Sequence, residues 1–401
     1  MFAAMRLIHT ADWHLGRLFH GVHLTADQAD VLEQLVALVR EVRPHAVLVA
    51  GDLYDRAVPP TEAVDLLDHV LSEIVLGLGV AVVAIAGNHD SPARVDFAAG
   101  LTRERGLHLV GRPRPEGARL VLADKHGPVH VLALPFADAA LARHAYGEAD
   151  LHDQQAVVAT GVARALASTP ADERRVLVTH AFVAGGEPSE SERPLTAVGG
   201  ADQVAAGTFA GFDYVALGHL HRPQQAGAAT VRYAGSLLKY SFAEHDHRKS
   251  VSVVDIGSPG SAEGDAGAAG RARVAVEQVE LRPPREVRRL EGSFDDLLAR
   301  GRDDPRRDDY VLAVLRDRGA VIDPIARLRE VYPNTLAVER PELLREGRAG
   351  RRRPDPRRVS EAQMFADFFT YVTGEPPTAA QAAAFAETVD TLLAAQREAT
   401  T

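Results

Sequence analysis

The sequence has no cysteine and no long apolar run among its 401 residues. Without cysteine there can be no disulfide bond, no thiolate-bound zinc and no thiol nucleophile, which is typical of a protein in a reducing cytoplasm. No apolar stretch approaches the ~20 residues that a membrane-spanning helix needs. The first residues also lack the basic and then apolar order of a signal peptide. We therefore expect a cytoplasmic protein with no membrane partner.

An excess of positive charge is also missing, because 55 acidic residues against 45 basic ones give a net charge of -10. If nucleic acid is the partner, the attraction has to come from a local basic surface, from bound metal ions or from another subunit. The length fits two or three domains, and a hydrophobic content of 46% with 25% charged residues allows a sizeable globular core.

Short Val-rich apolar runs alternate with amphipathic helical patterns in the first half of the chain. This order predicts a layered α/β fold whose sheet is covered on both faces. The expected strands cover residues 5–9, 46–50, 80–86, 129–134, 176–179 and 214–217, and the expected helices cover 25–42 and 61–76.

The second half changes in composition several times. A Gly, Ala and Ser-rich stretch predicts a flexible loop, and a basic, Pro-interrupted stretch predicts an unpacked linker. Between them, alternating apolar residues at 273–281 and 310–315 and helical patterns at 294–299 and 325–331 predict a small α+β domain. The expected division is a first domain at 1–255, a loop at 256–272, the small domain at 273–340, the linker at 341–359 and a helical segment at 360–401.

Five short polar motifs follow the expected strands in chain order, at the strand ends where open α/β sheets place ligand sites. In extended chain, Asp-x-His and His-x-His would point both side chains to the same side. Glycines before Asp52, Asn88 and His219 permit tight turns. The motifs are Asp12-Trp13-His14, Gly51-Asp52, Gly87-Asn88-His89-Asp90, His180 and Gly218-His219-Leu220-His221.

Imidazole and carboxylate groups together suit divalent transition metals such as Mn, Fe or Zn. The candidate ligands are too many for one ion that keeps an open position. Two ions ~3.5–4 Å apart, bridged by Asp52, would clamp a phosphate and supply a hydroxide. His89 is the expected acid for the leaving oxygen. The candidate ligands are Asp12, His14, Asp52, Asn88, His180, His219 and His221.

Each motif alone is typical of an ordinary turn or surface loop, but the ordered set favours a metal site. The set resembles the calcineurin-like metallophosphoesterase superfamily. The surrounding text (HTADWHLGRLFHG, AGDLYDRAVPP, AGNHDSPAR, DYVALGHLHRPQ and YAGSLLKYSFAE) resembles the SbcD nuclease family, densely from residue 5 to about 250 and loosely beyond. This resemblance implies a two-sheet sandwich flanked by helices, a DNA-facing cap domain and terminal helices that bind the SMC-like ATPase SbcC.

The resemblance further implies a Mn-dependent nuclease of DNA repair, recombination and replication. It would act as an exonuclease on double-stranded ends and as an endonuclease on hairpins or single strands, and it would form a homodimer within a heterotetramer. Asp55, Ser91 and Arg94 would contact the substrate, and His89 matches the family's catalytic histidine. By the same resemblance, one ion would be held by Asp12, His14, Asp52 and His221, and the other by Asp52, Asn88, His180 and His219.

Other readings stay open at this point. The same metal core could serve a phosphatase or a cyclic nucleotide phosphodiesterase, or the chain could be a non-catalytic binding module. The aromatic-rich residues 364–372 could dock a partner helix or form a core. The basic residues Arg282, Arg285, Arg288 and Arg289 could contact phosphates or form a solvated charged face.

Overall fold

The chain folds into two compact units, Met1–Val287 and Arg288–Thr401. The computed structural model describes residues 4–193, 195, 203–260, 271–341 and 361–398. Within these residues, no helix combines the length and apolar character that crossing a membrane requires.

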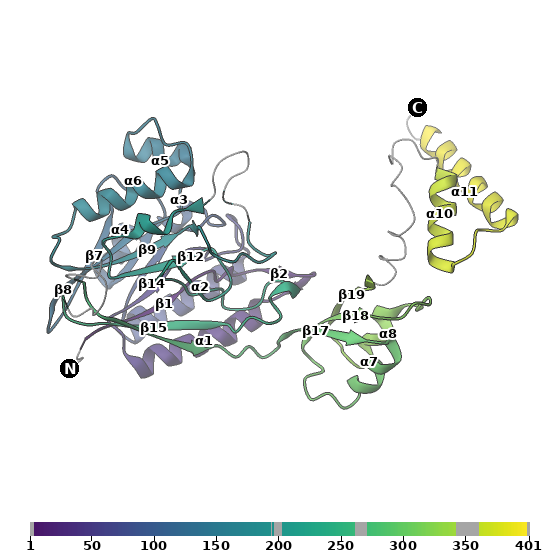
Figure 1. Ribbon diagram of the computed structural model, residues 1–401, viewed down its shortest axis with the longest axis horizontal. Helices are drawn as coiled ribbons and strands as arrows, with labels where there is room; N and C mark the ends of the chain where they lie inside the picture. The colour runs from purple at the N-terminus through teal and green to yellow at the C-terminus, as the bar shows by residue number, and fades with distance from the viewer. Residues whose placement is uncertain (1–3, 194, 196–202, 261–270, 342–360, 399–401) are drawn as a thin grey trace. The chain divides into compact units, whose positions relative to one another are not determined.

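Two six-stranded sheets form the centre of the first unit (Figure 1). The strand order of the first sheet is β16 (Val274–Glu280), β15 (Ser250–Ile256), β1 (Met5–Thr10), β4 (Ala46–Val49), β5 (Ala81–Ile85) and β6 (Leu107–Val110). The order of the second is β13 (Gln224–Ala226), β14 (Ala228–Tyr233), β12 (Tyr214–Gly218), β9 (Arg174–His180), β8 (Gly127–Leu134) and β7 (Ala118–Asp124).

The main core lies between these sheets, where Leu7 and Leu48 of the first pack in one cluster with Val131 and Val178 of the second. The outer face of the second sheet packs against α5 and α6, which lie above it in Figure 1, while α1 lies on the other side of the sandwich. Ile8, the neighbour of Leu7, is also fully buried, so both faces of β1 are covered. The helices are α1 (Thr25–Val42), α2 (Thr61–Ser72), α3 (Pro92–Val95), α4 (Ala99–Thr102), α5 (Ala139–Tyr146) and α6 (Gln154–Ala167).

The central strands of both sheets run parallel, which brings their carboxyl ends to common edges. In the first sheet β1, β4, β5 and β6 pair in parallel, and in the second β8, β9, β12 and β14 do so. The pairing ends with Thr10 opposite Val49 and with His180 opposite Gly218. The polar motifs that follow these strands therefore start from neighbouring positions.

The strands and helices expected in the first half of the sequence are confirmed, although α2 ends at Ser72 and continues as a π-helical turn over Glu73–Gly77. Strands β6, β7, β13, β14 and β15 and helices α3, α4, α5 and α6 were not predicted. Nor were the strands β2 (Leu18–Phe19), β3 (Val22–His23), β10 (Phe182–Val183) and β11 (Gln203–Val204), which are too short to show a hydrophobic period.

The predicted start of the small domain at residue 273 is wrong. Strand β16 pairs antiparallel with β15 along its whole length, from Ser250 opposite Glu280 to Ile256 opposite Val274, and so belongs to the first sheet. Its alternating burial fits an edge strand with one solvated face, a pattern that does not reveal which sheet it joins. Most of the predicted loop at 256–272 lies outside the described residues.

The second unit holds a sheet of β17 (Val287–Gly292), β18 (Tyr310–Leu315) and β19 (Thr335–Glu339) with α7 (Phe294–Gly301) and α8 (Pro324–Arg329). Leu297, Leu315 and Leu328 form its core, which confirms the α+β prediction. The predicted linker lies outside the described residues apart from Pro341. Beyond it, α10 (Glu361–Thr373) and α11 (Ala379–Glu398) meet through Phe365, whose ring stacks on that of Phe385 with centroids 4.1 Å apart.

Candidate metal centre

The loops that follow β1 and β4 are joined by main-chain hydrogen bonds. Asp12 N donates to Gly51 O at 3.0 Å, and His14 N donates to Asp52 O at 2.9 Å. These hydrogen bonds hold together two loops that are far apart in the sequence. The two loops carry three of the expected metal ligands, Asp12, His14 and Asp52.

Several expected ligands adopt left-handed backbone conformations. The φ angles are 53° at Asp12, 47° at His14, 51° at Asp52 and 109° at His219. The expectation that Asp12 and His14 lie in extended chain is therefore wrong. Such conformations cost about 1–3 kcal/mol each in a residue with a side chain, and they concentrate at functional sites.

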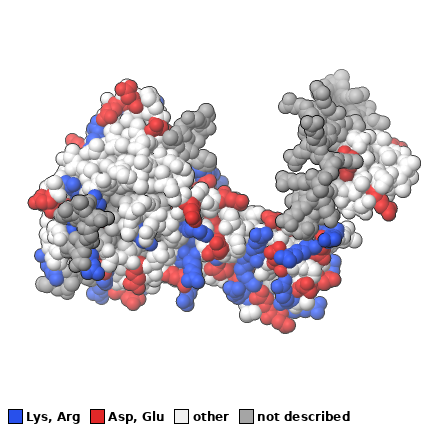
Figure 2. All heavy atoms as spheres, in the orientation of Figure 1, with Lys and Arg blue, Asp and Glu red and all other residues white. Residues whose placement is uncertain are grey.

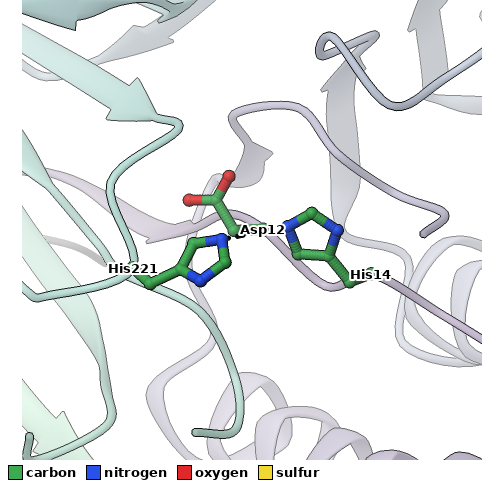
Figure 3. A group of neighbouring side chains, drawn as sticks. All are labelled: Asp12, His14 and His221. Atoms are coloured by element: carbon green, nitrogen blue, oxygen red, sulfur yellow. Dashed lines mark hydrogen bonds between the residues drawn. The ribbon is translucent and has the colours of Figure 1, made fainter. Parts of the chain in front are cut away.

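Asp12, His14 and His221 surround one buried space (Figure 3). The Nε2 atoms of His14 and His221 lie 3.1 Å apart, and Nδ1 of His14 has no hydrogen-bond partner among the described residues. Both carboxylate oxygens of Asp12 accept from His219 N, at 2.9 and 3.1 Å. Two imidazole nitrogens facing each other beside a carboxylate form a donor set suited to a cation.

Asp52, Asn88 and His180 form a second group next to the first. Nδ1 of His180 donates to Ala50 O at 3.0 Å, which leaves Nε2 as an acceptor. This nitrogen lies 2.8 Å from Asn88 Oδ1 and 3.6 Å from Asp52 Oδ2. Three atoms that all offer lone pairs converge here, as in a metal site whose histidine is oriented by a backbone carbonyl.

His89 lies beside these ligands, and its ring is within metal-binding reach of His14 and Asp52. Its Nδ1 donates to Asp55 O at 2.8 Å, its main-chain N donates to Asp52 Oδ1 at 2.9 Å, and its Nε2 lies 4.0 Å from Asp52 Oδ2. The ring packs edge-on against that of His14, with centroids 4.5 Å apart. The imidazole is therefore fixed at one nitrogen and aimed at the ligand groups with the other.

The three expected substrate contacts have different surroundings. The carboxylate of Asp55 binds Arg17 at 2.8 Å and lies 3.6 Å from His14 Nδ1. Ser91 is half-buried at the start of α3, and Arg94 is exposed on that helix. The structure therefore brings Asp55 to the cluster and shows no contact of Ser91 or Arg94 with it.

The charges of the site fit divalent cations. Burial, followed by the charge of Asp52, raises the pKa of Asp12 well above its usual range. Burial lowers the pKa of His14 and of His219 well below the usual range. A bound cation would stabilise both the carboxylate and the unprotonated imidazoles. The groups within metal-binding reach overlap through Asp12, His14 and Asp52, which suits two neighbouring ions.

Two glycines allow the loops to approach this closely. A Cβ on Gly87 would lie 2.2 Å from Asp52 Oδ1. A Cβ on Gly218 would lie 1.8 Å from Ala50 O and 2.9 Å from His180 Nδ1. Only a residue without a side chain fits at either place.

Asp90 was assigned no role of its own from the sequence, but its carboxylate joins two ligand loops. Its carboxylate accepts from Leu53 N at 3.0 Å, Tyr54 N at 2.9 Å and Gly87 N at 2.9 Å. Burial, followed by the charge of Asp52, raises the pKa of Asp90 to about 7. Its place directly after His89 was the only sequence signal for this role.

A buried polar network behind His221 was missed altogether. Nδ1 of His221 contacts Ser191 Oγ at 2.6 Å, and Ser191 Oγ donates to Glu244. Lys249 Nζ binds Glu244 Oε2 at 2.5 Å, Ser236 Oγ at 2.8 Å and His221 O at 2.8 Å. Such partners orient a ligand histidine, but they lie outside every motif.

Comparison with known proteins agrees with this geometry. The calcineurin-like phosphoesterase family model matches residues 5–223, and the model described as type 5 capsule protein repressor C-terminal domain matches residues 283–373. The SbcD subunit of the SbcCD nuclease of Staphylococcus saprophyticus is 28% identical over 382 residues, covering 94% of this chain and 96% of that protein.

Solved structures include a dimetal phosphatase from Danio rerio, 12% identical over 70% of this chain and all of that one, with a TM-score of 0.38. A hypothetical protein from Thermus thermophilus is 12% identical over 69% of this chain and 99% of its own, with a TM-score of 0.35. The family match spans more than half of the sequence and contains the whole metal cluster. The resemblance found in the motifs is thus confirmed, and the chain belongs to the calcineurin-like phosphoesterase family.

Proposed function

We propose that this chain is the nuclease subunit of an SbcCD-type complex and hydrolyses DNA phosphodiester bonds with two Mn ions. The observation that carries the proposal is the extent of the likeness to an SbcCD nuclease subunit, which reaches over 94% of the chain. A phosphatase or cyclic nucleotide phosphodiesterase would need the first unit alone. The second unit and the terminal helices therefore favour the nuclease.

In this proposal Asp12, His14, Asp52 and His221 would hold one ion, and Asp52, Asn88, His180 and His219 would hold the other. Bound divalent ions would supply a nucleophile from water and polarise the phosphate. The protein contributes the ligand loops and places Asp52 between the two groups, with its Oδ2 atom 3.6 Å from His14 Nε2 and 3.6 Å from His180 Nε2.

His89 is the proposed general acid. In the protonated ring, Nδ1 stays bound to Asp55 O, and Nε2 carries the proton that the leaving oxygen receives. Asp55 thus serves His89 through its carbonyl oxygen, while its carboxylate holds Arg17. Substrate contact by Asp55, Ser91 and Arg94 stays a prediction.

The expected phosphate contacts need correction at two arginines. Arg285 binds the carboxylate of Asp27 at 2.6 Å, and Arg288 binds Asp304 at 2.9 Å, so both guanidinium groups already hold acidic partners. Arg282 and Arg289 are exposed and keep the proposed role. Basic and acidic atoms are interspersed over the described surface drawn in Figure 2. Because acidic groups lie among the basic ones on this face, the proposed attraction for DNA would come from bound metals and from a partner subunit.

The terminal helices carry the proposed contact with SbcC. Met364, Phe368, Tyr371 and Val372 of α10 are all exposed, with Phe368 at 66%. An apolar helix face of this kind suits helix-in-groove recognition. Its exposure supports docking of residues 364–372 on the ATPase rather than a place for them in a hydrophobic core.

A second apolar surface supports the proposed homodimer. Leu76 is 70% exposed, and Phe97 and Leu101 are each 79% exposed. They line one groove of about 510 Å³ between α2 and the segment of α3 and α4. Exposed apolar patches of this kind mark protein–protein contacts.

The test is cleavage of linear duplex and hairpin DNA by purified protein with Mn, alone and with a co-expressed SbcC-type ATPase. Asp52→Asn should remove cleavage and His89→Gln should slow it by about 10²–10⁴. The exposed α2 variants Asp65→Asn and His69→Gln should retain it. Deleting residues 360–401 should abolish capture of the ATPase.

Two outcomes would contradict the proposal. Fast turnover of a nucleotide that survives deletion of residues 288–401, with no DNA cleavage, would favour the phosphatase. Fewer than one metal ion per chain after Mn supplementation would favour a binding module.

A further inference from the structure

Two buried polar side chains hold the turn that carries His14. The amide nitrogen of Gln28 lies 2.8 Å from His14 O and 3.1 Å from Trp13 O, and its oxygen accepts from Gly16 N at 3.1 Å. The hydroxyl of Tyr240 donates to Trp13 O at 2.5 Å and accepts from Gln28 at 3.1 Å. Every main-chain polar group that these two side chains bind belongs to residues 13–16.

The same tyrosine also touches the ligand rings. Its ring packs edge-on against His14 at a centroid distance of 5.4 Å and against His221 at 5.7 Å. Because His14 has a φ of 47°, its turn is strained and persists only while its surroundings hold it. The direction of the His14 imidazole therefore depends on Gln28 and Tyr240.

The last segment of the first unit binds the residues that precede Gln28 and Tyr240 in the sequence. Arg285 binds the carboxylate of Asp27 through Nη2 at 2.6 Å and Nε at 3.1 Å, and Asp27 is 1% exposed. Glu286 binds Lys239 Nζ at 2.5 Å. Asp27 directly precedes Gln28, and Lys239 directly precedes Tyr240. We name residues 281–287 the connector, because β17 of the second unit begins at its end.

We propose that the connector positions His14 for metal binding, by holding Asp27 through Arg285 and Lys239 through Glu286. Gln28 and Tyr240 are then positioning residues, and the metal affinity of the site depends on the segment through which the chain enters the second unit. This inference rests on the proposed function only in taking His14 as a metal ligand. Displacing the connector would change the site without touching a ligand.

The connector offers its own control. Gln34, farther along α1, bonds the main chain of the connector through Arg282 N at 3.0 Å and Arg282 O at 2.7 Å. This tie joins the same two elements and touches neither Gln28 nor Tyr240. Gln34→Ala therefore removes a hydrogen-bonded contact between α1 and the connector, while the bonds of Arg285 to Asp27 and of Glu286 to Lys239 stay in place.

The test is calorimetric titration of the full-length chain with Mn, together with thermal unfolding of the metal-free protein. Arg285→Met and Glu286→Gln should each weaken Mn binding on the order of tenfold, the lower end of the range for residues behind metal ligands. Gln34→Ala should bind Mn within about twofold of wild type, as a change remote from the ligand shell does. Equal affinities for wild type and Arg285→Met would overturn the proposal, and so would an equal loss in Gln34→Ala. A lower unfolding temperature with unchanged Mn affinity would show a merely structural role.

A pair of variants tests the route through Tyr240. Tyr240→Phe removes one hydroxyl and keeps the ring, so it keeps the protein measurable if Arg285→Met does not fold. Adding Glu286→Gln to Tyr240→Phe should weaken Mn binding no further, because both act on the same turn. Fully additive losses would contradict this route. If wild type itself binds no Mn, the proposed function fails; if it binds Mn and the connector variants match it, only this inference fails.

Discussion

Replacing Gly218 by alanine tests how closely the two sheets must approach at the metal centre. Its Cβ would lie 1.8 Å from Ala50 O, a main-chain atom that already accepts from His180 Nδ1. A backbone oxygen cannot rotate away, so the ends of β12 and β4 have to separate by roughly 1 Å or more. Overpacking of this kind costs up to about 3 kcal/mol. For a unit of this size, that loss lowers the unfolding temperature by roughly 6–12 °C.

The matched control is Gly207→Ala, whose Cβ would meet no atom within 4 Å and whose backbone is not left-handed. It should change the free energy of unfolding by less than about 0.5 kcal/mol. Both variants are compared by urea and thermal unfolding without metal, and then by Mn titration. Gly218→Ala should also bind Mn more weakly, because His180 would move with Ala50. Equal unfolding midpoints for the two variants would refute the reasoning.

Three further outcomes are expected. Burial lowers the pKa of His9 to about 3, so the neutral imidazole stabilises the fold fully above pH ~6.5. The free energy of unfolding should fall by on the order of 5 kcal/mol as the pH is lowered toward 3. In His9→Gln the free energy of unfolding should vary less between pH 3 and 7. His89→Gln should lower kcat by about 10²–10⁴ and leave Mn affinity unchanged; equal loss of Mn binding in titrations would instead make His89 a ligand. Asp124→Ala leaves the guanidinium of Arg174, at 1% exposure, without its carboxylate partner and should cost about 3–5 kcal/mol by urea unfolding; a change below 1 kcal/mol would contradict this.

The sequence predicted the parallel strands β1, β4, β5, β8, β9 and β12 and the polar groups that follow five of them, because buried strands and strand-end motifs leave local patterns. It did not predict the parallel strands β6 and β14. It could not assign β16 to a sheet, since strand pairing depends on residues far away in the chain. Nor could it show the left-handed turns at Asp12 and His14, because neither residue is a glycine and both conformations are held by tertiary contacts.

The residues behind the ligands were hidden for a related reason. Gln28 lies three positions before Val31 on the buried face of α1, and a polar residue there was the one available signal. Glu244, Lys249 and Tyr240 lie in segments without a hydrophobic period, and their partners are visible only after folding. For Arg285 the sequence suggested a role that the structure does not support. Its place among other arginines suggested contact with DNA, but its guanidinium binds the buried carboxylate of Asp27.

The most direct test of the account is the number of Mn ions bound per chain, measured by equilibrium dialysis and elemental analysis for wild type and Asp52→Asn. A two-metal centre that shares Asp52 predicts two ions per wild-type chain and weakened binding of both in the variant. One ion per wild-type chain, or a variant that loses one ion and keeps the other at full affinity, would contradict it.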